Sequence, residues 1–136
     1  MNERLGSPWR WVGAVLLLVT AGTHVPLIPE HLEEAPYVGA LFIALAVVGV
    51  VLAVLVAVRD TPLVWAASGL VTLLAAVAFL LSRTVGLPQI GDDVGNWTEP
   101  LGFPAVAAEL LTVVVTLVVL ERRNGAHGRR HRESTP

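Results

Sequence analysis

The apolar residues of this chain are gathered into four blocks, each about long enough to cross a bilayer. A helix needs about 20 mainly apolar residues to span a hydrocarbon core of about 30 Å. Hydrophobic residues make up 54% of the chain and charged residues only 15%, whereas soluble domains carry roughly 25% charged residues. The sequence therefore predicts an integral membrane protein, with spans at about 10–28, 37–58, 62–84 and 101–120.

The first block differs from the others because His24 and Pro26 interrupt it. One alternative is a cleaved signal peptide, since Arg4 and Arg10 precede a short apolar core that small residues follow. Apolar character resumes at 25–28, which favours a span that stays in the protein.

All nine basic residues are Arg, and their placement predicts the orientation. Only Arg83, at the end of the third span, falls on the side opposite to the rest. The other eight share the opposite side: Arg4, Arg10, Arg59, Arg122, Arg123, Arg129, Arg130 and Arg132. Positively charged loops stay in the cytoplasm, so both termini are expected inside. The predicted fold is all-α: a four-helix antiparallel transmembrane bundle over residues 1–120, N-in/C-in.

The last segment, 121–136, is polar, contains glycine and carries five Arg. We expect a disordered cytoplasmic tail that contacts anionic lipid headgroups. A nucleic-acid-binding tail is the alternative that a basic run suggests, but no nucleic-acid partner is predicted.

The chain has no Cys, which excludes disulfides and thiolate metal ligands. The absence of Lys, with abundant Ala, Val, Leu, Gly and Arg, is typical of a high-GC bacterium. The expected location is the bacterial plasma membrane.

Two loops should face outward, a short one at about 29–36 and a longer one at about 85–100. A loop of the second length is either mobile or packed as a lid. Trp97 favours a packed lid with its ring turned inward over the bundle mouth.

Polar residues recur at helical spacing on three of the spans, and each set shares one face: Thr20 and His24; Ser68, Thr72 and Ser82; Glu109, Thr112 and Thr116. Lipid cannot hydrogen-bond such groups. These faces are therefore expected to turn toward the interior.

Glu109 is the one carboxylate within an apolar block, roughly 12 Å from the end of its span. A charge at that depth costs about 2.5–3.5 kcal/mol, so the group should be paired or protonated and turned inward. Arg83 is the first candidate partner and His24 the second. Two interpretations stay open: a buried lock that fixes helix register, and the floor of an outward-open pocket.

The candidate ligand-binding residues lie at the outer ends of the spans and in the outer loops: Glu109, His24, Arg83, Tyr37, Ser82, Trp97 and Glu99. Candidate metal ligands are His24, Glu30 and His31. No catalytic residue and no cofactor are predicted, because no motif for an enzyme nucleophile, metal helix or phosphate loop is present.

Two stretches carry a resemblance, Ser82-Arg83-Thr84-Val85-Gly86-Leu87-Pro88 and Trp97-Thr98-Glu99-Pro100. Together with Tyr37-Val38-Gly39 and Glu109, they resemble the outer face of small, functionally uncharacterised four-span membrane proteins of actinobacteria. The resemblance implies four spans and a bacterial origin, and it implies no activity.

Function remains open between two main classes. The first expectation is a structural or accessory subunit of a larger membrane complex, or of a homo-oligomer, with the lipid bilayer as its surroundings. The alternative is an outward-facing binding or transport-related module for a cation, proton or small polar ligand that uses Glu109, His24 and Arg83. An enzyme is the least favoured class.

Overall fold

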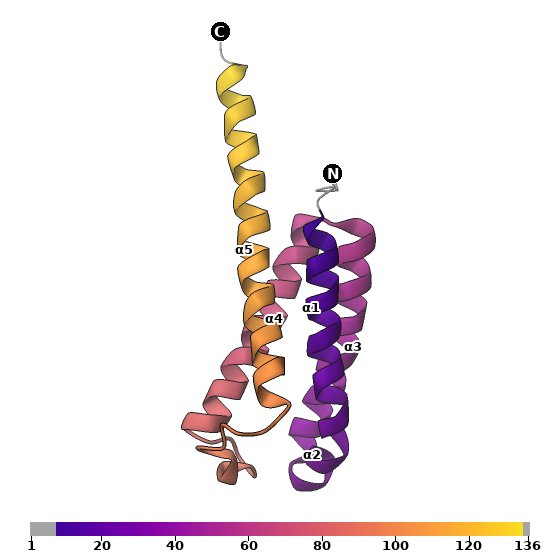
Figure 1. The fold of residues 1–136 in the computed structure, drawn as a ribbon, viewed down its shortest axis with the longest axis vertical. Coiled ribbons are helices and arrows are strands. Elements are labelled where there is room, and N and C mark those ends of the chain that lie inside the picture. Colours follow the sequence, from indigo (N-terminus) through magenta and orange to yellow (C-terminus); the bar gives the residue numbers. More distant parts are fainter. Residues whose placement is uncertain (1–7, 135–136) are drawn as a thin grey trace.

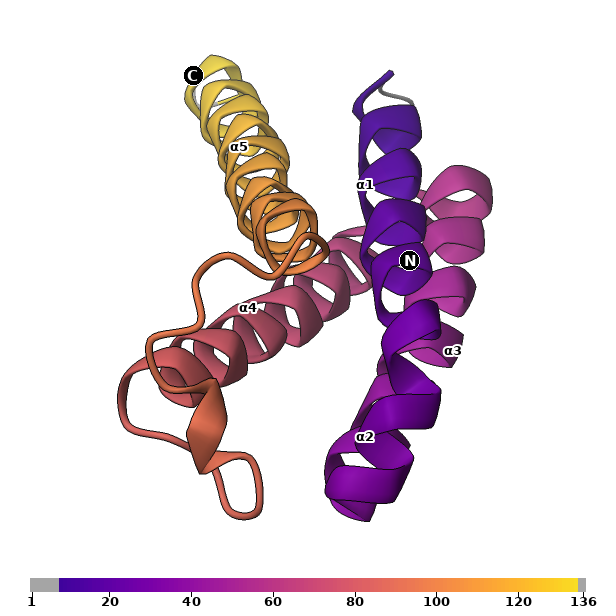
Figure 2. The ribbon, with the colours of Figure 1, turned by 60° about the horizontal axis from the view of Figure 1, so that its bottom comes forward.

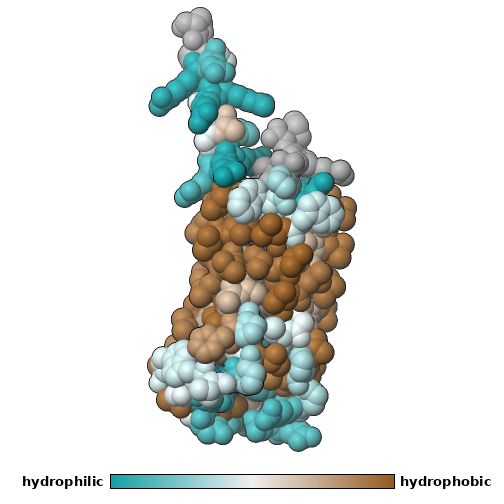
Figure 3. Space-filling model, viewed as in Figure 1, coloured by the Kyte–Doolittle hydropathy of each residue, from teal (hydrophilic) through white to brown (hydrophobic). Residues whose placement is uncertain are grey.

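The computed structural model describes residues 8–134, and all regular structure within them is helical. Four segments are long and apolar enough to cross a membrane: Trp9–Glu34, Pro36–Arg59, Pro62–Thr84 and Gly102–Glu133. Figure 3 shows the resulting apolar belt between two hydrophilic ends. The all-α prediction is confirmed, as are four helices of spanning length. Arg4 of the predicted basic N-terminus lies outside the described residues.

The first segment is a helix in three parts. The helix α1 covers Trp9–His24, a 3-10 turn covers Val25–Leu27, and α2 covers Ile28–Glu34. The predicted loop at about 29–36 is therefore wrong. Proline is tolerated in the first turn of a helix, because a backbone N–H at that position would have no intrahelical partner. Pro26 and Pro29 each occupy such a position, so neither of them ends the helical segment.

A turn of two residues joins the second and third spans. The helix α3 covers Pro36–Arg59 and α4 covers Pro62–Thr84. Asp60 adopts the left-handed conformation (φ 45°), which ends α3, and the Thr61 hydroxyl accepts a 3.4 Å hydrogen bond from the Val64 N–H as the cap of α4.

The last helix, α5, covers Gly102–Glu133 and extends past the other helices (Figure 1). The expected disorder from residue 121 is therefore wrong for 121–133. A helix already started in a packed segment extends at little cost per residue, and α5 has no proline after Pro104 in its first turn. Gly125 and Gly128 each cost about 1 kcal/mol relative to Ala, which does not end the helix.

Large apolar side chains fill the interior where the N-terminal half of α1 meets the α3–α4 turn. Leu17, Val56 and Trp65 are fully buried there. The Trp65 indole Nε1 donates a 2.7 Å hydrogen bond to Asp60 Oδ1. Its ring lies so close to Gly13 of α1 that a Cβ at this position would come within 2.5 Å.

The polar faces turn inward as predicted. Thr20, Ser68, Thr72, Ser82, Glu109, Thr112 and Thr116 are all buried, as is His24. Most of the hydroxyls donate to the carbonyl one turn earlier in their own helix, at 2.8 Å for Ser68 and 2.7 Å for Thr112. Thr116 instead donates to the Trp65 carbonyl of α4, at 3.3 Å.

The helices pack unevenly around the molecule. The helix α1 packs against α3 and α5, and α4 packs against α5, whereas α3 and α4 make few contacts. From their shared turn, α3 and α4 diverge toward the end formed by α2 and residues 85–101, which we call the loop end (Figures 1 and 2).

Candidate functional site: an amphipathic cavity between two helices

A cavity of about 440 Å³ fills the space between α3 and α4. Its walls run from Tyr37 to Val48 on α3 and from Val71 to Arg83 on α4, which is roughly 16–18 Å at 1.5 Å per residue. Most lining side chains are apolar. Small residues such as Ala75 and Ala78 occupy little volume and so leave the cavity wide.

The cavity opens sideways between the two helices. Leu41 on α3 and Leu74 on α4 both line it, yet they are 61% and 60% exposed at the surface of the apolar belt. A cleft with apolar lips within an apolar belt is open to lipid tails and unfavourable for water.

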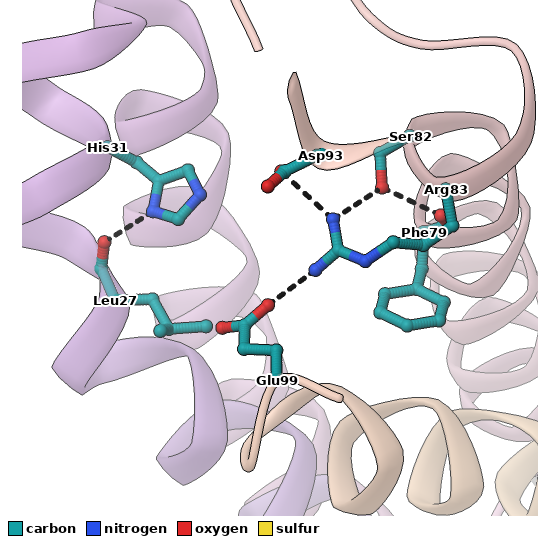
Figure 4. A network of polar contacts seen from close by, with 7 residues as sticks. All are labelled: Leu27, His31, Phe79, Ser82, Arg83, Asp93 and Glu99. Carbon is teal, nitrogen blue, oxygen red and sulfur yellow. Dashed lines mark hydrogen bonds and ion pairs between the residues drawn. The ribbon is translucent and has the colours of Figure 1, made fainter. Parts of the chain in front are cut away.

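Polar groups gather at the loop end of the cavity, around Arg83 (Figure 4). The Arg83 Nη1 lies 2.9 Å from Asp93 Oδ2 and donates a 3.2 Å hydrogen bond to Ser82 Oγ, and Nη2 is ion-paired with Glu99 Oε2. The guanidinium carbon lies 4.8 Å from the centre of the Phe79 ring. The buried guanidinium of Arg83 is therefore paired with carboxylates and hydrogen-bonded, as a charge in an apolar surrounding must be.

The loop that supplies Asp93 and Glu99 is held at further points. The Tyr37 hydroxyl donates a 2.7 Å hydrogen bond to the Pro88 carbonyl, and the Gly95 N–H donates to the Arg83 carbonyl at 2.9 Å. Ile90 is buried against Ala35 and Val38 at the start of α3. The 85–101 segment is thus packed against the ends of α3 and α4, as the lid prediction required.

Two histidines face the cavity from the opposite wall. The Nδ1 of His24 lies 2.7 Å from the Thr20 carbonyl oxygen, and the Nδ1 of His31 lies 2.8 Å from that of Leu27. A carbonyl only accepts, so Nδ1 carries the proton in both rings. In a neutral ring Nε2 is then a hydrogen-bond acceptor. Both rings also pack against Phe42, with centres 4.9 and 4.8 Å away.

His24 connects the cavity to Glu109. Its Nε2 lies 3.7 Å from Glu109 Oε1 on α5, where the carboxyl group is buried. Two bare lone pairs would repel each other, so the contact is attractive only with one further proton held on either group. The pair is then neutral overall. Glu109 Oε2 and Thr20 Oγ1 are buried without a hydrogen-bond partner in the part of the chain that the structure describes.

The predicted pairing of Arg83 with Glu109 is wrong. Arg83 turns toward the loop, because Asp93 and Glu99 approach it from residues that follow its own helix end, whereas Glu109 lies within α5. The second candidate, His24, is the residue that contacts Glu109. Glu109 does not line the cavity; it faces it only through His24.

The other predicted site residues divide into two groups. His24, Arg83, Tyr37, Ser82 and Glu99 line the cavity. Trp97 does not: it is 40% exposed, and its ring meets Phe79 edge-on at 6.2 Å. The predicted inward position of Trp97 is therefore wrong, and Ile90 is the buried apolar residue of the lid.

The candidate metal ligands do not form a metal-binding group. His31 and His24 line the cavity, but Glu30 does not. No cluster of three or more His, Cys, Asp or Glu side chains suited to a metal ion occurs among residues 8–134.

Sequence reasoning missed Asp93, Phe42 and Ile90. Asp93 and the exposed Asp92 are adjacent acidic residues in one loop, and nothing local distinguishes the one that turns toward Arg83. Ile90 carried a usable signal, since it is a β-branched apolar residue within a polar loop.

The arrangement combines a long apolar cleft with a compact polar end. Arg83 with Asp93 and Glu99 contributes one positive and two negative charges, a sum of −1. Such a site suits a molecule with an apolar chain and a polar head. Comparison of the chain with protein-family models, with curated proteins and with solved structures finds no match.

Proposed function

We propose that this chain is a small multi-pass membrane protein that binds a lipid-like amphiphile, which enters sideways from the bilayer between α3 and α4. The observation that carries the proposal is the cavity itself, with apolar walls and lips and one polar end. Ligand sites of 300–1,000 Å³ with mostly apolar walls and a few polar groups are the rule for small molecules. This develops the binding-module expectation, with the cavity lining in place of a pocket floored by Glu109.

The proposed topology is an antiparallel four-helix bundle in the bacterial plasma membrane, with both termini cytoplasmic. Arg placement supports this orientation, since Arg83 in the last turn of α4 is the one Arg at the loop end within residues 8–134. Reporter fusions after Glu133 and near Asp92 test it. An external C-terminus would contradict the orientation, and intact-mass measurement tests whether the first span is retained.

Filling the cavity tests the function. Ala78 lines it and is exposed to the open space, and Ala78→Trp would place an indole there. Ala66, also exposed on α4 but outside the cavity, supplies the matched control Ala66→Trp. Protein purified from its native membranes should carry a stoichiometric amphiphile, detected by mass spectrometry. We expect Ala78→Trp to lose it and Ala66→Trp to keep it; equal retention in both would refute binding in the cavity.

A second candidate function is the accessory subunit, and the projecting end of α5 favours it. Every residue from 124 to 133 is exposed, although this stretch is helical. A polar helix that projects beyond the bundle can bridge to a second domain or subunit, and here the second body would be a partner complex. Native purification of the full chain and of a chain ending at Asn124 tests this. Larger subunits should co-purify only with the full chain.

A further inference from the structure

The polar end of the cavity also restricts the kind of head group that it accepts. We propose that the cavity takes an amphiphile whose head is a protonated amine and excludes phosphate, sulfate and carboxylate heads. This inference rests on the proposed function and names the ligand class of the same site.

The first argument is that the cation at this end is already neutralised. Arg83 faces Asp93 at 2.9 Å and Glu99 across a second ion pair, and its Nη1 also bonds Ser82 at 3.2 Å. Its Nε has no partner among the described residues, but an anion brought there would also meet both carboxylates. An incoming anion must therefore displace a carboxylate or be repelled by it.

The second argument is the sum of the charges that face the cavity. Arg83, Asp93 and Glu99 sum to −1, and the His24–Glu109 pair is neutral when it holds one proton. At the loop end, Glu30, Glu33, Glu34 and Asp92 add exposed carboxylates, and Arg83 is the one Arg there within residues 8–134. An approaching cation is attracted both by the cavity and by its rim.

The third argument is the surplus of acceptors. The Nε2 of neutral His31 is an acceptor, because its Nδ1–H is directed at the Leu27 carbonyl at 2.8 Å. Figure 4 shows His31 across the space from Arg83, with the second oxygen of Glu99 turned away from the guanidinium. An ammonium head has three donors and no acceptor, so it complements these groups, whereas a phosphate head offers mainly acceptors.

Three probes with the same twelve-carbon chain separate the alternatives: dodecylammonium, dodecanol and dodecyl phosphate. Their affinities are measured by titration calorimetry on the full chain in phosphatidylcholine nanodiscs, with protein-free nanodiscs subtracted. We expect dodecylammonium to bind most tightly and to exceed dodecyl phosphate by at least about tenfold, as expected for one unit charge at contact range near a protein surface.

Charge variants locate the source of the preference. Asp93→Asn and Glu99→Gln should each reduce the preference for the ammonium probe severalfold. Asp92→Asn removes the same charge from the neighbouring exposed residue, where solvent and salt screen it. It should therefore reduce the preference much less than Asp93→Asn does.

The outcomes distinguish the two proposals. If no probe binds more to the unchanged protein than to Ala78→Trp, the proposed function fails. If the probes bind but the phosphate or the alcohol binds as tightly as the ammonium, the head-group inference is overturned while the proposed function stands. Equal effects of Asp92→Asn and Asp93→Asn would also overturn the head-group inference, because the preference would then come from overall charge.

Discussion

The imidazole of His24 on α1 and the carboxyl group of Glu109 on α5 meet at 3.7 Å in the interior of the helices. Both side chains are buried, and they join the first and last helices of the chain. Their contact therefore helps to fix how α1 and α5 align. This supports the interpretation of Glu109 as a lock, with His24 as the link to the cavity.

A double-mutant cycle tests this lock. His24→Leu should lower the free energy of unfolding by about 1–3 kcal/mol, because it leaves the buried carboxyl group without a partner. Adding Glu109→Leu should recover most of the loss, since no polar group of the pair then remains buried alone. Denaturant unfolding in detergent micelles measures His24→Leu, Glu109→Leu and the double variant. Additive losses would show that the two residues do not interact.

The Asp60–Trp65 hydrogen bond supports a second prediction. Asp60→Ala should lower the free energy of unfolding by about 2–4 kcal/mol, because it removes the acceptor of the buried Trp65 N–H and strains the left-handed backbone at φ 45°. Asp60→Asn keeps an acceptor oxygen and tolerates that conformation, so it should stay within about 1 kcal/mol of the unchanged protein. Thermal unfolding followed by circular dichroism measures both, and similar losses would count against this account.

Two glycines of α1 should respond in opposite directions to the same substitution. A Cβ at Gly13 would lie 2.5 Å from the fully buried Trp65 ring, so Gly13→Ala should destabilise the protein by about 1–3 kcal/mol. A Cβ at Gly22 would meet nothing within 4 Å, and Gly22→Ala should stabilise it by about 0.5–1 kcal/mol. The same unfolding assay compares the two variants. A stabilising Gly13→Ala would show that α1 and α4 can move apart freely at this contact.

Arg83 should control the order of the lid. Arg83→Gln removes the ion pairs to Asp93 and Glu99, so hydrogen exchange of backbone amides in 86–100 should accelerate by at least about tenfold. Arg59→Gln is the control, since Arg59 is exposed at the end of α3 that lies away from the lid. This variant should leave hydrogen exchange in 86–100 unchanged. Unaltered exchange in Arg83→Gln would mean that Tyr37 and Ile90 suffice to hold the lid.

The sequence predicted the four spans and their inward polar faces because both depend on local patterns. Apolar length determines a span, and helical spacing puts Thr20 beside His24 or Glu109 beside Thr112, so a single face must turn from lipid. These features require no knowledge of which helices are neighbours.

The contacts of Arg83, Trp97 and the cavity could not be predicted in the same way. The partner of Arg83 depends on how residues 85–101 fold back, and the cavity depends on how far α3 and α4 diverge; neither has a local signature. The two wrong boundaries have a different origin. Pro26 and Gly125 disfavour a helix in isolation, and the packed helix beside each of them outweighs that preference.

For the amphiphile that we propose, the sideways opening of the cavity means that only the head group is selected and the tail is not. Lipid tails are as apolar as the walls that Leu41 and Leu74 provide. Any chain that protrudes past these residues therefore moves from one hydrocarbon surrounding to another at almost no cost. Because a tail can leave through this opening, amphiphiles with long and short tails should compete on equal terms as long as they share a head group.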